Sequence, residues 1–198
     1  ADRRISTLQP PLATRNPPTP LKHATSIMQT RTLWLTVSLA LLAAYFGYVA
    51  IAYPKLPDRI PVHFNLHGEP DNWSQKSSFV TWYSAFVLCM NGLLLVVFPR
   101  LLRKTPESLI NIPWKDYWFS TSERKQEAFE KTHTMLFITG AYVNLILLGI
   151  YHSIVRAALQ ETERQPRIAI HLVWIFLLTA FYIAGLIFYA KPPRHERE

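Results

Sequence analysis

Cysteine is nearly absent from this chain of 198 residues, and two common catalytic signatures are missing altogether. A single cysteine, Cys89, excludes a small secreted scaffold held together by disulfides. Neither Gly-x-Ser-x-Gly nor His-Glu-x-x-His occurs, so the sequence lacks the nucleophile turn of α/β-hydrolases and the zinc motif of many metalloproteases. A non-enzymatic protein is therefore favoured over an enzyme.

Charge is missing from four long stretches, although 17% of the chain is charged. A soluble helix needs charge on its outer face, whereas charge-free runs of about 20 residues match the hydrocarbon core of a bilayer. We therefore predict an all-α integral membrane protein with four transmembrane helices. These would occupy residues 32–54, 77–99, 132–155 and 168–190.

Basic residues are distributed unevenly around the four stretches. Most of the 21 Lys and Arg residues lie before the first stretch, between the second and third, and after the fourth. Because cytoplasmic loops are enriched in Lys and Arg, we expect both termini in the cytoplasm and a structured extracytoplasmic loop at residues 54–76. Acids interleave with the basic residues of the inner loop, which disfavours a nucleic-acid partner.

The two ends of the chain differ from the membrane domain at residues 28–190. Residues 1–27 are rich in proline and lack apolar periodicity, so we expect them to be disordered. Met28 is the first methionine, and we expect the natural start there. Residues 191–198 form a charged tail on the cytoplasmic side.

Two amides interrupt the apolar stretches. Asn91 and Asn144 lie near the middle of the second and third, where an unsatisfied amide is costly. We expect an interhelical hydrogen bond, for instance between the two, and a polar cavity or permeation path is the alternative. Residues 120–123 read Ser-Thr-Ser-Glu, a capping-box pattern that predicts a helix beginning before the third stretch.

Small residues recur at helical spacing in the first and fourth stretches, which allows another helix to approach closely. This pattern leaves open a role as an accessory or structural subunit of a larger membrane complex. The residues are Ala40, Ala43, Ala44 and Gly47 in the first stretch and Ala180 and Ala184 in the fourth.

The outer loop holds four candidate metal ligands. Imidazole and carboxylate suit zinc, but a His pair at four-residue spacing is convincing only on a helix, and nearby Pro and Gly oppose one. The alternatives are a loop held in shape by His63 and Trp73, and recognition of an envelope peptide or lipid. We expect no cofactor. The candidate ligands are His63, His67, Glu69 and Asp71.

The outer loop also resembles a known membrane family. It contains Leu-Pro, then Ile-Pro-x-His-Phe, and then Gly-x2-Asp-x-Trp-x2-Lys. This pattern is similar to the domain of unknown function 1648, which also forms the N-terminal part of SdpI-type immunity proteins. The motif positions taken as candidate ligand-binding residues are His63, Phe64, Gly68, Asp71, Trp73 and Lys76.

The inner loop strengthens the resemblance, which covers about residues 28–189. Its Asn-x-Pro-x-Lys-x-Tyr-Trp stretch is similar to stand-alone members of the family. The resemblance implies a small multi-pass protein of the bacterial plasma (inner) membrane. Immunity follows less directly, because SdpI-type proteins add a further membrane domain with no counterpart in this sequence. The inner motif residues are Asn111, Pro113, Lys115, Tyr117 and Trp118.

The inner motif also has a reading independent of the family. Its aromatic rings beside a lysine are typical of a segment at the membrane interface, and a docking surface for a cytoplasmic partner is the alternative. Taken together, the two loops predict an envelope-sensing, ligand-binding or immunity-like membrane protein. Its partners would be the lipid bilayer and an envelope peptide or another membrane protein. A metal-dependent membrane enzyme using His63 and His67 is the less favoured reading.

Overall fold

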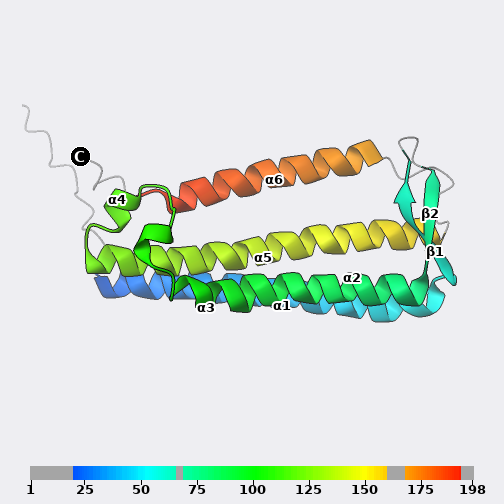
Figure 1. Cartoon of the computed structure of the whole chain (residues 1–198), viewed down its shortest axis with the longest axis horizontal. Coiled ribbons are helices and arrows are strands. Elements are labelled where there is room, and N and C mark those ends of the chain that lie inside the picture. The colour runs from blue at the N-terminus through cyan, green and yellow to red at the C-terminus, as the bar shows by residue number, and fades with distance from the viewer. Residues whose placement is uncertain (1–19, 66–68, 160–167, 193–198) are drawn as a thin grey trace, which may run out of the picture.

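The structure, a computed structural model, describes residues 20–65, 69–159 and 168–192. It is mostly helical, with one small sheet at an end of the molecule and a short helix, α4, at the opposite end (Figure 1). The principal helices are α1 (Pro20–Ala52), α2 (Lys76–Asn91), α3 (Phe98–Leu102), α4 (Lys115–Trp118), α5 (Ser122–Ala158) and α6 (Ile168–Ala190).

The prediction of an all-α protein is wrong for the first loop. Strands β1 (Arg59–Phe64) and β2 (Pro70–Gln75) form an antiparallel hairpin between α1 and α2. The residues that favoured an irregular loop are compatible with this hairpin, because Pro70 stands at the first position of its strand and a two-stranded sheet tolerates proline at its edges.

Three helices are long and apolar enough to cross a membrane, by length and composition. They are Thr25–Lys55, Lys76–Leu102 and Ser122–Ala158, and they contain the first three predicted stretches completely. Helix α6 has the bounds of the fourth predicted stretch. Its apolar segment Ile175–Ala190 is shorter than the three membrane-length helices.

Helix α1 begins earlier than the sequence predicted. It starts at Pro20, so residues 20–27 are helical rather than part of a disordered segment. Proline is well accommodated in the first turn of a helix, where its missing N–H has no intrahelical acceptor. The remainder of the predicted disordered segment, residues 1–19, and most of the charged tail lie outside the described residues.

The second helical run is continuous but not uniform. Between α2 and α3, residues Gly92–Val97 form a π-helical segment, in which the turns are wider than in an α-helix. Pro99 follows in the first turn of α3.

Helix α5 begins where the capping pattern predicted. The Thr121 side chain accepts a hydrogen bond from the backbone N–H of Arg124 at 3.2 Å, which satisfies one of the free N–H groups at the helix start. The helix therefore begins about ten residues before the third predicted stretch.

The core lies between α1, α2 and α5, with the hairpin packed on its end. Tyr45, Val87 and Tyr151 come from the three helices, and Ile60 of β1 is completely buried with them. Among the described residues, the hydroxyl of Tyr151 is the one buried side-chain polar atom without a hydrogen-bond partner. The hairpin is thus part of the core rather than a mobile appendage.

The two amides within the apolar stretches bond to each other, as predicted. The Nδ2 of Asn91 donates to Oδ1 of Asn144 at 2.8 Å, and the Nδ2 of Asn144 donates back at 2.9 Å. Asn144 also donates to the carbonyl of Ser38 at 3.0 Å, and the Ser38 hydroxyl donates to the carbonyl of Phe137 at 2.8 Å. One buried polar cluster therefore joins α1, α2 and α5.

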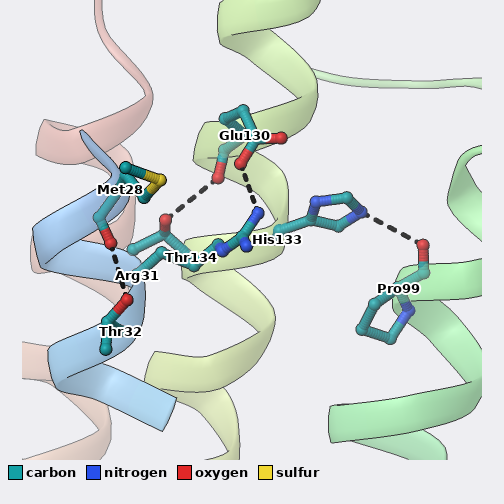
Figure 2. Close-up of polar contacts among 7 residues, drawn as sticks. All are labelled: Met28, Arg31, Thr32, Pro99, Glu130, His133 and Thr134. Carbon is teal, nitrogen blue, oxygen red and sulfur yellow. Dashed lines mark hydrogen bonds and ion pairs between the residues drawn. The ribbon is translucent and has the colours of Figure 1, made fainter. Parts of the chain in front are cut away.

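A second set of polar contacts joins α5 to α1 and α3 (Figure 2). Arg31 of α1 forms a 2.7 Å ion pair with Glu130 of α5. On another side of α5, Nε2–H of His133 donates to the carbonyl of Pro99 in α3 at 3.1 Å. These contacts therefore fix α5 to α1 and to α3.

Helix α6 packs on α5 through a few polar aromatic contacts. The rings of Tyr142 and Tyr182 are stacked, with their centroids 4.3 Å apart. The hydroxyl of Tyr182 lies 2.5 Å from that of Thr139, and Tyr142 is hydrogen-bonded to Thr179. Away from the α4 end, α6 diverges from the other long helices (Figure 1).

Candidate functional site

The outer-loop motif folds into the hairpin in a defined register. Arg59 pairs with Gln75 and Pro61 pairs with Trp73, and the register shifts on either side of His63. Because Ile60 anchors one face of β1 in the core, the exposed residues of β2 are held in place at the end of the molecule.

His63 and Asp71 meet across the hairpin. The Nδ1–H of His63 donates to the carboxylate of Asp71 at 2.5 Å, and both side chains are exposed. This contact agrees with the reading in which His63 holds the loop in shape, although its partner is Asp71 rather than Trp73. Asn65 and Glu69 close the turn through hydrogen bonds of their side chains and backbones.

The candidate metal ligands are only partly brought together. His63 contacts Asp71, whereas Glu69 bonds to Asn65. His67 and Gly68 lie outside the described residues. Within the described part of the chain, no three His, Cys, Asp or Glu side chains are grouped so that they could hold a metal ion.

Lys76 fastens the base of the hairpin. Its ammonium donates to the carbonyl of Leu56 at 2.9 Å, lies 3.4 Å from the carboxylate of Asp58 and sits over the ring of Tyr53. Its backbone N–H donates to the carbonyl of Asp58. The motif lysine is therefore held by several groups, which gives it a structural role.

A cavity of about 740 Å³ opens at the base of the hairpin, and we call it the Trp73 cavity. Its wall combines aromatic rings, cations and hydroxyl groups from the end of the first helical run, from both strands of the hairpin and from the start of α2. Trp73 is 46% exposed, and no ion pair is found for Arg59 among the described residues. The lining includes Tyr53, Asp58, Arg59, Trp73, Ser74 and Lys76.

The Trp73 cavity contains only part of the predicted outer site. Trp73 and Lys76 line it, whereas His63, Phe64 and Asp71 lie elsewhere on the hairpin. Sequence reasoning missed Asp58 and Arg59 as lining residues. The spacing between Tyr53 and Trp73 did not indicate that they line the same cavity, because it is the fold of the hairpin that places both there.

The inner motif lies at the opposite end of the molecule, around α4 (Figure 1). Trp118 is buried, and its indole N–H donates to the carbonyl of Ala190 at 3.1 Å. Lys115 donates to the carbonyl of Glu107 at 2.7 Å. Before α4, Trp114 has a positive φ of 55°, a backbone conformation that is unusual for a bulky residue.

A second cavity, of about 230 Å³, lies beneath the inner motif, and we call it the Trp118 cavity. Asn111, Pro113 and Trp118 line one side, and Lys131 and Met135 of α5 line another. Tyr117 instead lies against Arg124, whose guanidinium carbon is 4.4 Å from the centre of the Tyr117 ring. The inner and outer motif residues thus form two separate sites rather than one.

The fold and the two cavities define a mostly helical protein with membrane-length helices and a hairpin between the first two. Residues 40–89 match the family model of the domain of unknown function DUF1648. This match confirms, for these residues, the similarity to the domain that the outer-loop motif predicted. The match includes the hairpin and the Trp73 cavity but not the inner motif, so it is shorter than the predicted resemblance.

A relative supports the similarity over a longer part of the chain. An uncharacterized protein of Archaeoglobus fulgidus is 23% identical over 152 residues, which cover 74% of this chain and 80% of the relative. This relative is an archaeal protein. No solved structure matches the chain.

Proposed function

We propose that the chain is a four-span protein of the bacterial plasma membrane that binds an envelope ligand through its hairpin. Both termini would lie in the cytoplasm and the hairpin outside. Three membrane-length helices, together with α6 at the fourth apolar stretch, support the number of spans. The distribution of Lys and Arg supports the orientation.

The observation that carries the proposed binding role is the Trp73 cavity. Exposed Trp and Tyr side chains offer large contact areas at low entropic cost, and Arg adds directed hydrogen-bond donors. Trp73, Tyr53 and Arg59 supply these groups around one cavity. This chemistry suits a segment of an envelope peptide, or a lipid headgroup, that presents both an apolar surface and an acceptor.

The hairpin is also placed to communicate binding to the rest of the protein. Ile60 of β1 is buried against the core that includes Tyr151 and Val155 of α5. Helix α5 continues from there to the opposite end of the molecule (Figure 1). A sensing or immunity-like role is therefore consistent with the architecture, since a ligand that moved β1 would act directly on a core helix.

Complementation tests this proposal in a cell that carries the gene and shows a phenotype when it is deleted. We expect Trp73→Ala and Arg59→Gln to reach the membrane at the wild-type level but to fail to restore function. Trp82→Ala is the matched control, because Trp82 is 76% exposed on α2 and lies outside the Trp73 cavity. Full complementation by both cavity variants would contradict a ligand-binding role.

A second candidate function, a subunit of a larger membrane complex, is favoured by the small residues of α1. Ala40, Ala43, Ala44 and Gly47 are all exposed, and a Cβ at Gly47 would meet no atom within 4 Å. The chain itself thus leaves this close-packing face uncovered. Purification in mild detergent should then yield a defined hetero-complex, and a homogeneous monomer or dimer would count against this candidate.

A further inference from the structure

The Trp118 cavity is lined mainly by apolar groups and has one cation, Lys131, in its lining. Lys131 of α5 lies beside the apolar stretch formed by Met135 and Leu136, and the opposite side is formed by Pro113 and Trp118. The lining reaches along α5 from Ala128 to Thr139, which at 1.5 Å per residue is about 16 Å of helix. Its shape is therefore that of a short groove with one cation along an apolar path.

Lys131 is held in position but keeps donor capacity. Its ammonium lies over the rings of Trp118 and Tyr189, 5.1 and 5.0 Å from their centres. It donates to the carbonyl of Tyr189 at 3.2 Å, and the carboxylate of Glu127 lies 3.8 Å away. Since an ammonium carries three N–H donors, the fixed cation can still serve a further acceptor.

The position of the cavity relative to the proposed membrane favours an amphipathic occupant. Lys131 is the last charged residue before the apolar stretch at residues 132–155, and Trp118 lies beside it. Trp rings and Lys side chains gather at the level of lipid headgroups. From Lys131, the apolar wall runs towards Asn144 and the middle of the predicted span.

We propose that the Trp118 cavity binds one anionic phospholipid of the cytoplasmic leaflet. The lipid phosphate accepts hydrogen bonds from Lys131 and from the side-chain amide of Asn111, and part of an acyl chain lies along Met135 and Leu136. Glu127 remains paired with Lys131, so the phosphate joins an ion pair rather than meeting an isolated cation. This inference requires the membrane placement proposed above but not a ligand in the Trp73 cavity.

Native mass spectrometry of the full chain tests this inference, with phosphatidylglycerol and phosphatidylcholine offered in equal amounts in mixed micelles. We expect the wild type to retain one phosphatidylglycerol. A hydrogen bond contributes about 1 kcal/mol net, so loss of the direct bond from Lys131 to the phosphate in Lys131→Gln should lower the preference for phosphatidylglycerol about fivefold. Lys131→Arg should restore it.

Two further variants separate a built site from general surface attraction. Lys125→Gln removes the same charge from α5 at a lysine that is paired with Glu107 outside the cavity, and it should leave the preference unchanged. Ala128→Leu narrows the apolar groove and should reduce retention of either lipid. Equal losses in the Lys125 and Lys131 variants, or no preference in the wild type, would overturn the proposal.

Discussion

The buried amide pair should contribute to stability as one unit. Asn144→Leu removes both bonds that join it to Asn91 and the bond to the Ser38 carbonyl. It also leaves the carbonyl oxygen of the Asn91 side chain buried without this partner. Hydrogen bonds between membrane helices contribute about 0.6 kcal/mol each on average, and a stranded polar group costs about 1 to 3 kcal/mol. We therefore expect a loss of about 3 to 5 kcal/mol.

The double variant Asn91→Leu/Asn144→Leu provides the sharper test. It removes the stranded amide together with its partner, so its loss should be smaller than the sum of the two single losses. We expect a coupling free energy of about 1 to 2 kcal/mol between the two positions. Reversible unfolding in detergent micelles, followed by circular dichroism, measures all four members of this cycle.

A remote pair supplies the control for this cycle. Thr105 lies beyond the end of α3, and its side-chain hydroxyl donates to the nearby Leu101 carbonyl. Thr105→Ala combined with Asn91→Leu should therefore be additive within about 0.5 kcal/mol. If the stability losses of Asn91→Leu and Asn144→Leu were equally additive, the bonds between the two amides would not stabilise the packing of α2 on α5.

Three further predictions concern packing, a buried hydroxyl and metal. Gly140→Ala should destabilise the protein by about 1 to 3 kcal/mol, because the new Cβ would lie 2.8 Å from the side chain of Leu95. Gly149→Ala meets open space and should be neutral or stabilising by up to about 1 kcal/mol. Thermal unfolding in detergent compares the two variants. In the same assay, Tyr151→Phe removes an unpaired hydroxyl and should not destabilise the protein, whereas Tyr83→Phe removes a 2.7 Å bond to a backbone carbonyl and should cost about 1 kcal/mol. Elemental analysis should find no divalent ion in stoichiometric amount, and one ion per chain that is lost in His63→Ala would reopen the metal-enzyme reading.

The sequence predicted those features that depend on local chemistry or on the solvent around a helix. The charge-free stretches located the long apolar helices because a missing charge is visible in one dimension. The start of helix α5 was recognisable from residues 120–123 alone, and Thr121 within them caps the helix. The bond between Asn91 and Asn144 was expected because a bilayer or a core leaves an amide few other partners.

The hairpin could not be predicted in the same way. Its strands are short, and Pro61 and Pro70 are also typical of irregular loops. What stabilises β1 is the burial of Ile60 against residues that are distant in the sequence. Local pattern therefore indicated a structured loop without indicating its secondary structure.

The two cavities depend on still longer-range contacts. The Trp118 cavity joins the inner motif to Lys131 and to Ala190 at the end of α6, and no periodicity links these positions. The aromatic motif did suggest a functional segment. It did not indicate that Trp118 would be buried, with its indole N–H bonded to the carbonyl of Ala190. Such sites become visible only when the helices are placed side by side.

Cysteine labelling in intact cells tests the proposed membrane arrangement most directly. In a Cys89→Ser background, Gln75→Cys marks the exposed hairpin and Ser108→Cys marks the exposed segment before α4. A membrane-impermeant maleimide should label the cysteine at 75 in intact cells and the cysteine at 108 only after the membrane is permeabilised. The reverse pattern, or equal labelling of both without permeabilisation, would contradict an outward-facing hairpin.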